Sequence, residues 1–341
     1  MSQYEQCSLS DVVNALQFID ADCSRDDWVQ VGMAIKSEFA DAFDVFDAWS
    51  QNADSYKPRD CLATWKSIKA SGGVGIGTLF KQAMGRGFEF DKRELTDAEK
   101  REFAIEREAR AKKRAEVEAR EQAETAAWHK RIAEAAQYIW LGLVPEGESE
   151  YLAKKQVGAY GVRFVQKGLV IVFGETPEQL RLIHGRAEIN AFFKNRSKDD
   201  SLRYLKKGQL VVPLFDEGGE LVNLQIIYKT GDKAFLKHGR KSGCYHLVGE
   251  ITEQTAVLAF AEGYATAASI HEATGWPVVV TFDCGNIPPV VRMFRSRYPS
   301  LKFLIAADDD SQTKNAGITK AREAANECGA AVVLPVFSEV A

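Results

Sequence analysis

In the sequence Leu301-Lys-Phe-Leu-Ile-Ala-Ala-Asp308-Asp309-Asp310, an apolar run leads directly into three consecutive carboxylates. An apolar run of this length, buried on both faces, is typical of a central strand in a parallel sheet. We therefore expect the carboxylates at the carboxyl end of that strand, where α/β folds bind ligands. Three like charges at one point repel one another, and a divalent cation such as Mg²⁺ removes that conflict. A solvated acidic turn is the plainer alternative.

A second stretch, Val257-Leu-Ala-Phe-Ala-Glu262-Gly263, also reads as a strand that ends in a carboxylate. A helix from residue 265, a strand over 277–282 and a helix over 287–298 lie between the two stretches. This alternation predicts a parallel sheet with right-handed crossovers. Glu262 and the Asp run would then share one edge of the sheet. An acid able to move a proton, beside an Asp-x-Asp pair able to hold metal, is what phosphoryl or nucleotidyl transfer requires.

Three motifs follow one another along this part of the sequence: Glu262-Gly263, then Asp308-Asp309-Asp310, then Asn315-Ala-Gly317-Ile-Thr-Lys320-Ala. They resemble the Toprim domain, most closely that of phage- and plasmid-type primases, and the resemblance covers residues 251–341. It implies an α/β domain that binds Mg²⁺ or Mn²⁺ through Glu262, Asp308, Asp309 and Asp310. Toprim domains also occur in topoisomerases and in some nucleases, so the domain leaves the reaction open.

The composition of the 341 residues is ordinary for a globular protein and gives a net charge of −4. The six cysteines contain no Cys-x-x-Cys pair, which disfavours a zinc ribbon and favours reduced thiols. No apolar run approaches membrane-spanning length, so we expect a cytoplasmic protein without a membrane partner. Residues 150–250 nevertheless carry 17 Lys and Arg against 11 Asp and Glu. A basic segment beside an acidic one suits a protein that handles polyanions, although a Lys-rich surface is the simpler explanation.

Residues 1–90 are expected to form a small α-helical domain, with Ser10 capping its first helix and Thr78 its fifth. We expect one core to contain three tryptophans, namely Trp28, Trp49 and Trp65. The pattern Asp27-Trp28…Gly32-Met-Ala…Trp49-Ser50…Trp65…Gly77-Thr78-Leu-Phe…Ala83 resembles the PriCT module, a helical domain found beside the catalytic domains of phage and plasmid primases. This resemblance carries over no catalytic residues and leaves the role of the module open.

Residues 91–137 are rich in Ala, Glu, Arg and Lys, and Thr96-Asp-Ala-Glu99 has the form of a capping box. The segment is predicted to be a long, solvated helical linker. A coiled coil is the alternative, but sustained apolar heptads are missing. Apolar spacing returns over 136–141, so we expect this end of the helix to dock onto the next domain.

Residues 138–250 are predicted to be an α+β subdomain whose strands lie at 169–173, 210–215, 221–228 and 234–236, with a hairpin turn at Gly218-Gly219. The segment resembles the basic subdomain that precedes Toprim in DnaG-type primases, through Val212-Pro213-Leu-Phe-Asp-Glu-Gly-Gly, Lys233-Ala-Phe-Leu and Lys241-Ser-Gly-Cys-Tyr245. That resemblance makes Lys233 and Lys241 the first candidates for holding nucleotide or template phosphates. The full set of candidates is Lys206, Lys207, Lys229, Lys233, Lys237, Arg240, Lys241 and, in the third Toprim motif, Lys320.

The chain departs from its suspected relatives in three ways. Bacterial primases carry a zinc ribbon in front, which this sequence lacks, so template selection would fall to another part, with the helical module as the candidate. They also have an Asp four residues after the Glu, where this chain has Thr266. Relatives in phages continue past the last Toprim strand with an acidic segment, whereas this sequence ends at Ala341. We therefore expect a piece of a longer primase or primase–helicase.

The favoured function is a DNA primase that makes short RNA primers from nucleoside triphosphates on a single-stranded DNA template in phage, plasmid or mobile-element replication. Glu262, Asp308 and Asp310 would be catalytic, with Glu262 either a metal ligand or the acceptor of a proton. A replicative helicase, or a helicase domain later in a longer chain, is a further expected partner. A Toprim nuclease and a non-catalytic nucleic-acid-binding module are the alternatives.

Overall fold

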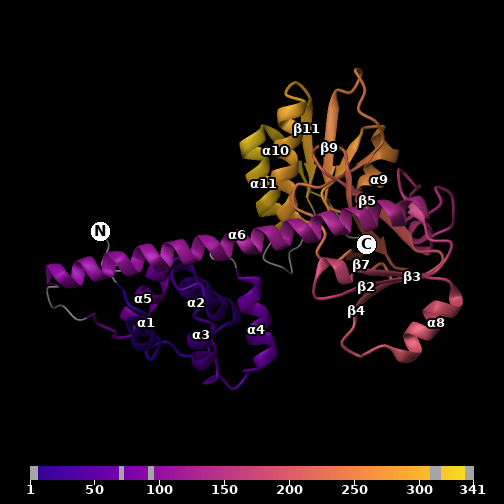
Figure 1. The fold of residues 1–341 in the computed structure, drawn as a ribbon. Helices are drawn as coiled ribbons and strands as arrows, with labels where there is room; N and C mark the ends of the chain where they lie inside the picture. The colour runs from indigo at the N-terminus through magenta and orange to yellow at the C-terminus, as the bar shows by residue number, and fades with distance from the viewer. Residues whose placement is uncertain (1–6, 69–72, 91–95, 308–315, 335–341) are drawn as a thin grey trace, which may run out of the picture. The chain divides into compact units, whose positions relative to one another are not determined.

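The computed structural model describes residues 7–68, 73–90, 96–307 and 316–334. The chain divides into two compact units, Met1–Glu124 and Thr125–Ala341. A single helix, α6 (Asp97–Leu141), belongs to both units (Figure 1). The multidomain α+β organisation predicted from the sequence, with a helical N-terminal region, is confirmed.

The first unit is built from short helices packed around one aromatic core, followed by the first part of α6. These helices are α1 (Leu9–Leu16), α2 (Arg25–Glu38), α3 (Phe43–Ser50), α4 (Pro58–Ser67) and α5 (Ile76–Met84). Trp49 and Trp65 are buried in the core, and Trp28 packs against it from α2. The ring of Phe46 lies between the three tryptophans, with centroid separations of 5.0, 6.1 and 5.6 Å. The prediction of one tryptophan-containing core is confirmed.

Two predicted helix caps are wrong. Ser8, rather than Ser10, caps α1, because Ser8 and Asp11 form a reciprocal capping box in which each side chain accepts from the other's backbone N–H. Gly75, rather than Thr78, is the N-cap of α5, so Thr78 already lies inside the helix. In both cases the helix begins two or three residues earlier than the apolar spacing indicated.

The first part of α6 is a helix, as predicted, and it contacts the carboxyl end of α2. Arg110 Nε lies 3.2 Å from a carboxylate oxygen of Glu38, and Arg114 Nη1 donates to the carbonyl of Ser37 at 2.6 Å. Cations are favourable at that end because the last carbonyls of a helix lack intrahelical partners. This stretch of α6 is therefore more than a solvated spacer.

The described residues of the second unit form three β-sheets. A three-stranded antiparallel sheet has the order β3-β2-β4 and a four-stranded one the order β1-β5-β6-β7. Their strands are β1 (Arg163–Phe164), β2 (Leu169–Phe173), β3 (Arg181–His184), β4 (Ser201–Leu205), β5 (Leu210–Phe215), β6 (Leu221–Ile227) and β7 (Lys233–Phe235). The hairpin between β5 and β6 turns at Gly219, whose φ of +80° favours glycine, so this predicted turn is confirmed.

The third sheet has the order β12-β11-β9-β10-β8, and its strands are parallel except for β8 at one edge. The strands are β8 (His246–Val248), β9 (Val257–Ala261), β10 (Val278–Val280), β11 (Lys302–Ala306) and β12 (Ala330–Val333). The parallel arrangement of β9, β10 and β11 agrees with the alternation of strands and helices in the sequence.

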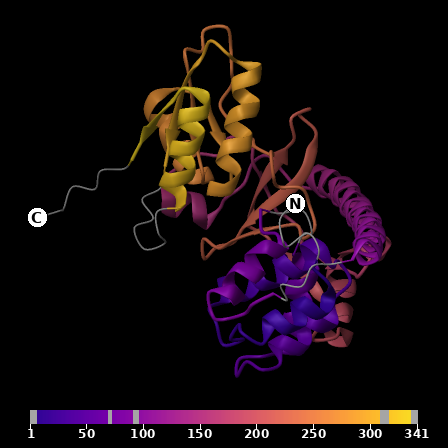
Figure 2. The same ribbon diagram turned by 90° about the vertical axis from the view of Figure 1, so that its left-hand side faces the viewer.

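Helices cover both faces of this sheet. Leu258 and Phe260 of β9 pack with α10 (Ile287–Arg297) and α11 (Ala316–Cys328), which Figure 2 shows side by side. Ala259 and Ala261 of β9 point to the opposite face and pack with α9 (Tyr264–Thr274). The same core on that face includes strands of the four-stranded sheet, so residues on either side of position 250 share one core. Burial on both faces explains the continuous apolar runs in the sequence.

The last part of α6 packs onto the two antiparallel sheets. Trp128, Ile132, Ala136 and Ile139 are buried there among residues of β2, β5 and β6, as the return of apolar spacing predicted. The two remaining helices of this unit are α7 (Glu150–Lys155) and α8 (Arg186–Asn195). No helix in the described ranges has both the length and the hydropathy needed to cross a membrane.

Candidate active site and lysine pocket

The candidate active site lies at the carboxyl edge of the parallel sheet. Ala261, the last residue of β9, pairs with Ala306 of β11 on one side and with Val280 of β10 on the other. β9 and β11 therefore end side by side, so the residues that follow them, Glu262 and Ala307, leave the sheet at the same edge. The next residues, Asp308, Asp309 and Asp310, lie outside the described residues.

Glu262 is fixed through its backbone. Its carbonyl accepts from the N–H of Phe282 at 2.9 Å, and the preceding carbonyl of Ala261 accepts from Thr281 N–H at 2.9 Å. Phe282 has a φ of +70°, an uncommon conformation for a bulky residue and one that tends to occur at functional sites. Burial raises the pKa of the nearby Cys284 thiol, and the negative charges of Glu262 and Asp283 raise it further. The backbone of Glu262 is thus held where β9 meets the turn after β10.

Lys241 is positioned at this edge by a buried amide. Asn286 donates from Nδ2 to the carbonyls of Cys244 and Thr281, both at 2.8 Å, while its Oδ1 accepts from Gly243 N–H at 2.7 Å. These bonds fasten the turn that follows Lys241 to the end of β10. Lys241 Nζ then lies 2.8 Å from Asp283 Oδ2 and 5.4 Å from the centre of the Phe235 ring.

A pocket of about 510 Å³ is lined by Gly263, the residue that follows Glu262, and is rich in lysines. Its cationic side chains come from α7 and from the turn between β6 and β7; they are Lys154, Lys155, Lys229 and Lys233. Gly263, Ala265 and Thr266, at the start of α9, form another wall. A Cβ placed on Gly263 would lie 3.3 Å from Lys233 Nζ, so this ammonium approaches the α9 N-terminus closely.

The pocket has the electrostatics of a phosphate site. Gly263, the N-cap of α9, makes no side-chain cap, and helix N-termini attract anions through their backbone N–H groups. Against the four lysines, Asp232 is the acidic residue that lines the pocket, while Lys229 also forms an ion pair with Glu150. Tyr151 and Leu152 anchor α7 in the core, which leaves Lys154 and Lys155 exposed on its outer side. A ligand with several phosphates would compensate this excess of positive charge.

The remaining candidate cations are more scattered. Lys207 and Lys229 line a second pocket of about 550 Å³. Lys206 Nζ lies 5.2 Å from the centre of the Tyr204 ring, and Lys237 Nζ lies 3.4 Å from Ser201 Oγ. Two others are paired with carboxylates: Arg240 with Asp216 at 3.5 Å, and Lys320 with Glu323 at 2.6 Å. The structure therefore gathers Lys229 and Lys233 beside Glu262, with Lys241 at the same edge.

Lys154 and Lys155 are not among the residues chosen from the sequence. A Lys-Lys doublet in a six-residue helix is usual for a solvated surface, and only the packing of α7 reveals which pocket it faces. Asp283 and Asn286 are also new, and a short polar stretch after a buried strand could have pointed to them.

Within the described ranges no group of three or more His, Cys, Asp or Glu side chains could hold a metal ion. Of the four residues that the Toprim resemblance assigns to metal, Glu262 is the one described. The donors present fit a hard cation in chemical type, since carboxylate oxygens are what Mg²⁺ and Mn²⁺ prefer.

Part of the first unit is similar to a known protein family. Residues 12–83 match the family Primase C terminal 2 (PriCT-2), which confirms the predicted helical module. A 134-residue stretch is 39% identical to the DNA primase TraC of Escherichia coli; it covers 37% of this chain and 13% of that relative. The chain thus spans a small part of the curated relative's length, and that relative is a primase, as the motifs indicated.

Two solved structures show more distant likeness. The primase fragment of the bacteriophage T7 primase–helicase protein matches at 15% identity and a TM-score of 0.29, over 38% of this chain and 54% of that one. The DnaG primase catalytic domain bound to single-stranded DNA matches at 10% identity and a TM-score of 0.39, over 64% and 76%. At TM-scores this low, the two matches support no conclusion about the fold or the function of this chain.

Proposed function

We propose that this chain is the catalytic part of a DNA primase of plasmid or phage type, which joins nucleoside triphosphates into a short RNA primer on single-stranded DNA. The observation that carries the proposal is the lysine pocket at the start of α9, which is lined by Gly263, the residue after Glu262. A triphosphate needs several cationic contacts, and a nucleotidyl transfer needs an acid next to them. The similarity to TraC, a DNA primase, supports the same reaction.

In this reaction the 3′-hydroxyl oxygen of the growing primer bonds to the α-phosphorus, the bond to the β-phosphate oxygen breaks, and pyrophosphate leaves. Lys154, Lys155, Lys229 and Lys233 would hold the phosphates and neutralise the departing pyrophosphate. Glu262 would accept the hydroxyl proton or ligate metal. Mg²⁺ or Mn²⁺ held by Glu262, Asp308, Asp309 and Asp310 would polarise the α-phosphate.

The remaining cations would guide the template. Lys207 shares the second pocket with Lys229, so a strand lying there would run toward the triphosphate. Such contacts position the strand without reading its sequence. We further propose that the chain acts in the cytoplasm together with a replicative helicase, either as a separate protein or as a later domain of the same polypeptide.

The test is incubation of the chain with α-labelled ribonucleoside triphosphates, single-stranded DNA and Mg²⁺ or Mn²⁺. We expect short RNA products that depend on template and metal and that vanish with a chelator. A nuclease would instead degrade the DNA without nucleotide-dependent products, and a binding module would yield no product with either metal. Either result would refute the proposed reaction.

The acidic residues provide a sharper version of this test. Glu262→Gln, Asp308→Asn and Asp310→Asn should each reduce incorporation by about a hundredfold or more, while melting temperatures stay within a few degrees of the wild type. Glu253→Gln, which changes an exposed carboxylate in the turn before β9, is the matched control and should keep full activity. Full activity in Asp308→Asn or Asp310→Asn would remove that residue from the mechanism.

A further inference from the structure

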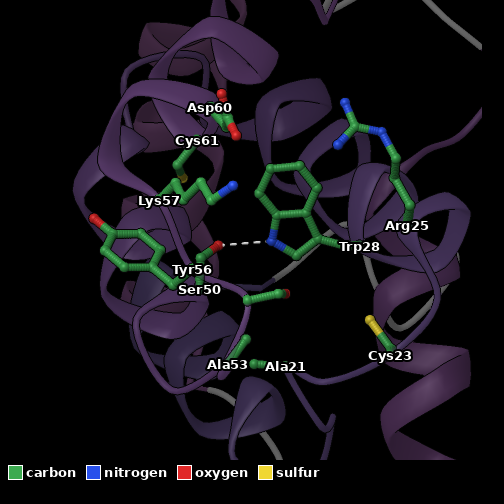
Figure 3. Close-up of a pocket in the computed structure, with 11 residues that line it drawn as sticks. Ala21, Cys23, Arg25, Trp28, Ser50, Ala53, Tyr56, Lys57, Asp60 and Cys61 are labelled. Atoms are coloured by element: carbon green, nitrogen blue, oxygen red, sulfur yellow. Dashed lines mark hydrogen bonds between the residues drawn. The ribbon is translucent and has the colours of Figure 1, made fainter.

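The helical unit contains a pocket that the proposed chemistry does not use (Figure 3). Its volume is about 290 Å³, near the lower limit of about 300 Å³ for small-molecule sites. The first turn of α2, the end of α3, the loop after α3 and the first turn of α4 supply its walls. The side chains that matter are Arg25, Trp28, Ser50, Tyr56, Lys57 and Asp60.

Trp28 forms a fixed aromatic wall. Its Nε1–H donates to Ser50 Oγ at 2.9 Å, and that hydroxyl donates to the carbonyl of Phe46 at 2.7 Å (Figure 3). The ring of Phe46, with its centroid 5.0 Å away, supports the indole from the core side. The indole is half-buried and lines the pocket with its remaining surface. A tryptophan held at its N–H and along its ring is a rigid platform for another flat ring.

The polar groups are arranged around that platform. Arg25 lies with its guanidinium carbon 6.0 Å from the centre of the Trp28 ring, and Lys57 extends from the start of α4. Tyr56, on the same loop, is oriented by a bond from its hydroxyl to Asp47 Oδ1 at 2.9 Å. Lys57, the N-cap of α4, makes no side-chain cap, and the N-terminal end of the helix dipole adds a modest positive potential there. Asp60 places one carboxylate on the lining.

This combination narrows the class of ligand. Aromatic walls call for a flat ring, and two cations call for negative charge. An acidic peptide side chain would satisfy the cations but leave the indole uncovered. A phosphate inside the pocket would share it with the carboxylate of Asp60, which lines the same space. A nucleotide avoids both problems when its base enters the pocket and its phosphates stay outside with Arg25 and Lys57.

We propose that this pocket takes one unpaired base of a single-stranded nucleic acid by stacking on Trp28, with Arg25 and Lys57 contacting the phosphates on either side. Stacking of a base on an aromatic side chain tolerates any sequence, because every base has a π-face. Residues 1–90 carry 8 basic and 13 acidic side chains, so this unit would repel a nucleic acid that lay along much of its surface. A contact limited to two phosphates is compatible with that charge. The choice of ligand rests on the proposed primase function, whereas the site itself does not.

The test uses the full-length chain without metal or nucleoside triphosphates, so that no synthesis can occur. A deoxythymidine decamer carrying one 5-iododeoxyuridine is cross-linked by light, and the modified peptides are identified by mass spectrometry. We expect a cross-link in the peptide containing Trp28 or Tyr56. Unlabelled decamer should compete at a lower nucleotide concentration than thymidine monophosphate, because only the strand offers two flanking phosphates.

Matched variants assign the contacts. The double variant Arg25→Gln/Lys57→Gln should lose most of this cross-link, and the salt slope of its strand affinity should fall by up to about 1.4 log units, roughly 0.7 for each contact. The control Lys66→Gln/Lys81→Gln removes two exposed cations of the same unit outside the pocket and should change nothing. Trp28→Leu should weaken cross-linking by about fivefold to a hundredfold.

The inference is overturned if no peptide of the helical unit is cross-linked, or if the charge variant matches its control. Equal competition by thymidine monophosphate would overturn the assignment to a strand and show a site for free nucleotides. Primer synthesis is measured separately, so either proposal can fail without the other. A chain that synthesises primers but gives no cross-link at Trp28 would retain its function and lose this site.

Discussion

At the scale of single residues, His246 in β8 is held in its neutral form by its surroundings. The side chain is buried, and burial lowers its pKa to about 4. Its Nε2 lies 2.9 Å from the carbonyl of Tyr160, and the ring of Tyr264 lies 5.9 Å away. The Nδ1 atom is also buried and has no hydrogen-bond partner among the described residues. Protonation would place a charge where there is little to stabilise it.

This environment predicts a loss of stability in mild acid. Between the unfolded-state pKa of His, near 6.5, and the folded-state value of about 4, the unfolded chain binds a proton that the native chain does not. Stability should therefore fall as the pH drops through this interval, by about 3 kcal/mol in all. Urea midpoints at pH 7.5 and 5.0 should move closer together in His246→Gln. In the control His184→Gln, which changes an exposed histidine, they should stay as far apart as in the wild type.

Lys36 is a buried cation with a complete set of partners. Its Nζ donates to the carbonyls of Trp65 and Ile68 at 3.2 and 2.7 Å and lies 3.1 Å from Glu121 of α6. Lys36→Met leaves both carbonyls without this donor, so we expect a loss of about 1–3 kcal/mol in the free energy of unfolding. Lys66→Met, at an exposed position of α4, should cost less than about 0.5 kcal/mol. Equal unfolding midpoints for the two variants would contradict a structural role for Lys36.

At the scale of elements, the tight turn between β6 and β7 determines where two of the pocket lysines lie. Tyr228 N–H donates to the carbonyl of Asp232 at 2.9 Å, and Gly231 has a φ of +96°. Lys229 and Lys233 flank this turn, and Lys233 thereby reaches the N-terminus of α9. The turn, rather than the flexibility of the lysines, presents both ammonium groups to the same pocket.

The double variant Lys229→Ala/Lys233→Ala should therefore raise the KM for nucleoside triphosphates by about tenfold or more and lower kcat as well, because these contacts also position the reacting phosphate. The control Lys194→Ala/Lys198→Ala removes two exposed lysines in and just after α8 and should leave both constants unchanged. Steady-state incorporation rates at varied nucleotide concentration distinguish the two. A normal KM in the first variant would exclude the pocket as the triphosphate site.

Elements with strong local signals could be predicted from the sequence. The strands that end at Ala261 and Ala306 are continuous apolar runs, and such runs are buried between helices whatever the rest of the chain does. The starts of α1 and α5 could not be placed as well, because several residues there can serve as caps and the winner depends on reciprocal bonds such as that between Ser8 and Asp11.

At the scale of the whole molecule, the sequence indicated the acidic edge and the basic segment but not which cations meet the edge. Lys229, Lys237 and Lys320 look alike in the sequence, yet only the first lines the pocket beside Glu262. Lys154 comes from a helix more than 100 positions before Glu262, so no local pattern connects the two. The packing of α7 and α9 in one core brings Lys154 to the pocket that Gly263 also lines.

We propose that the lysine pocket and the acidic edge together synthesise RNA on single-stranded DNA. The most direct measurement is the yield of labelled primer from the wild type, from Lys229→Ala/Lys233→Ala and from Glu262→Gln, with and without template, at saturating Mn²⁺ or Mg²⁺. We expect template-dependent oligoribonucleotides from the wild type, about tenfold less from the lysine variant at subsaturating nucleotide, and about a hundredfold less or lower from Glu262→Gln. Equal yields from all three proteins, or no template-dependent product from the wild type, would contradict the proposed synthesis of RNA by this site.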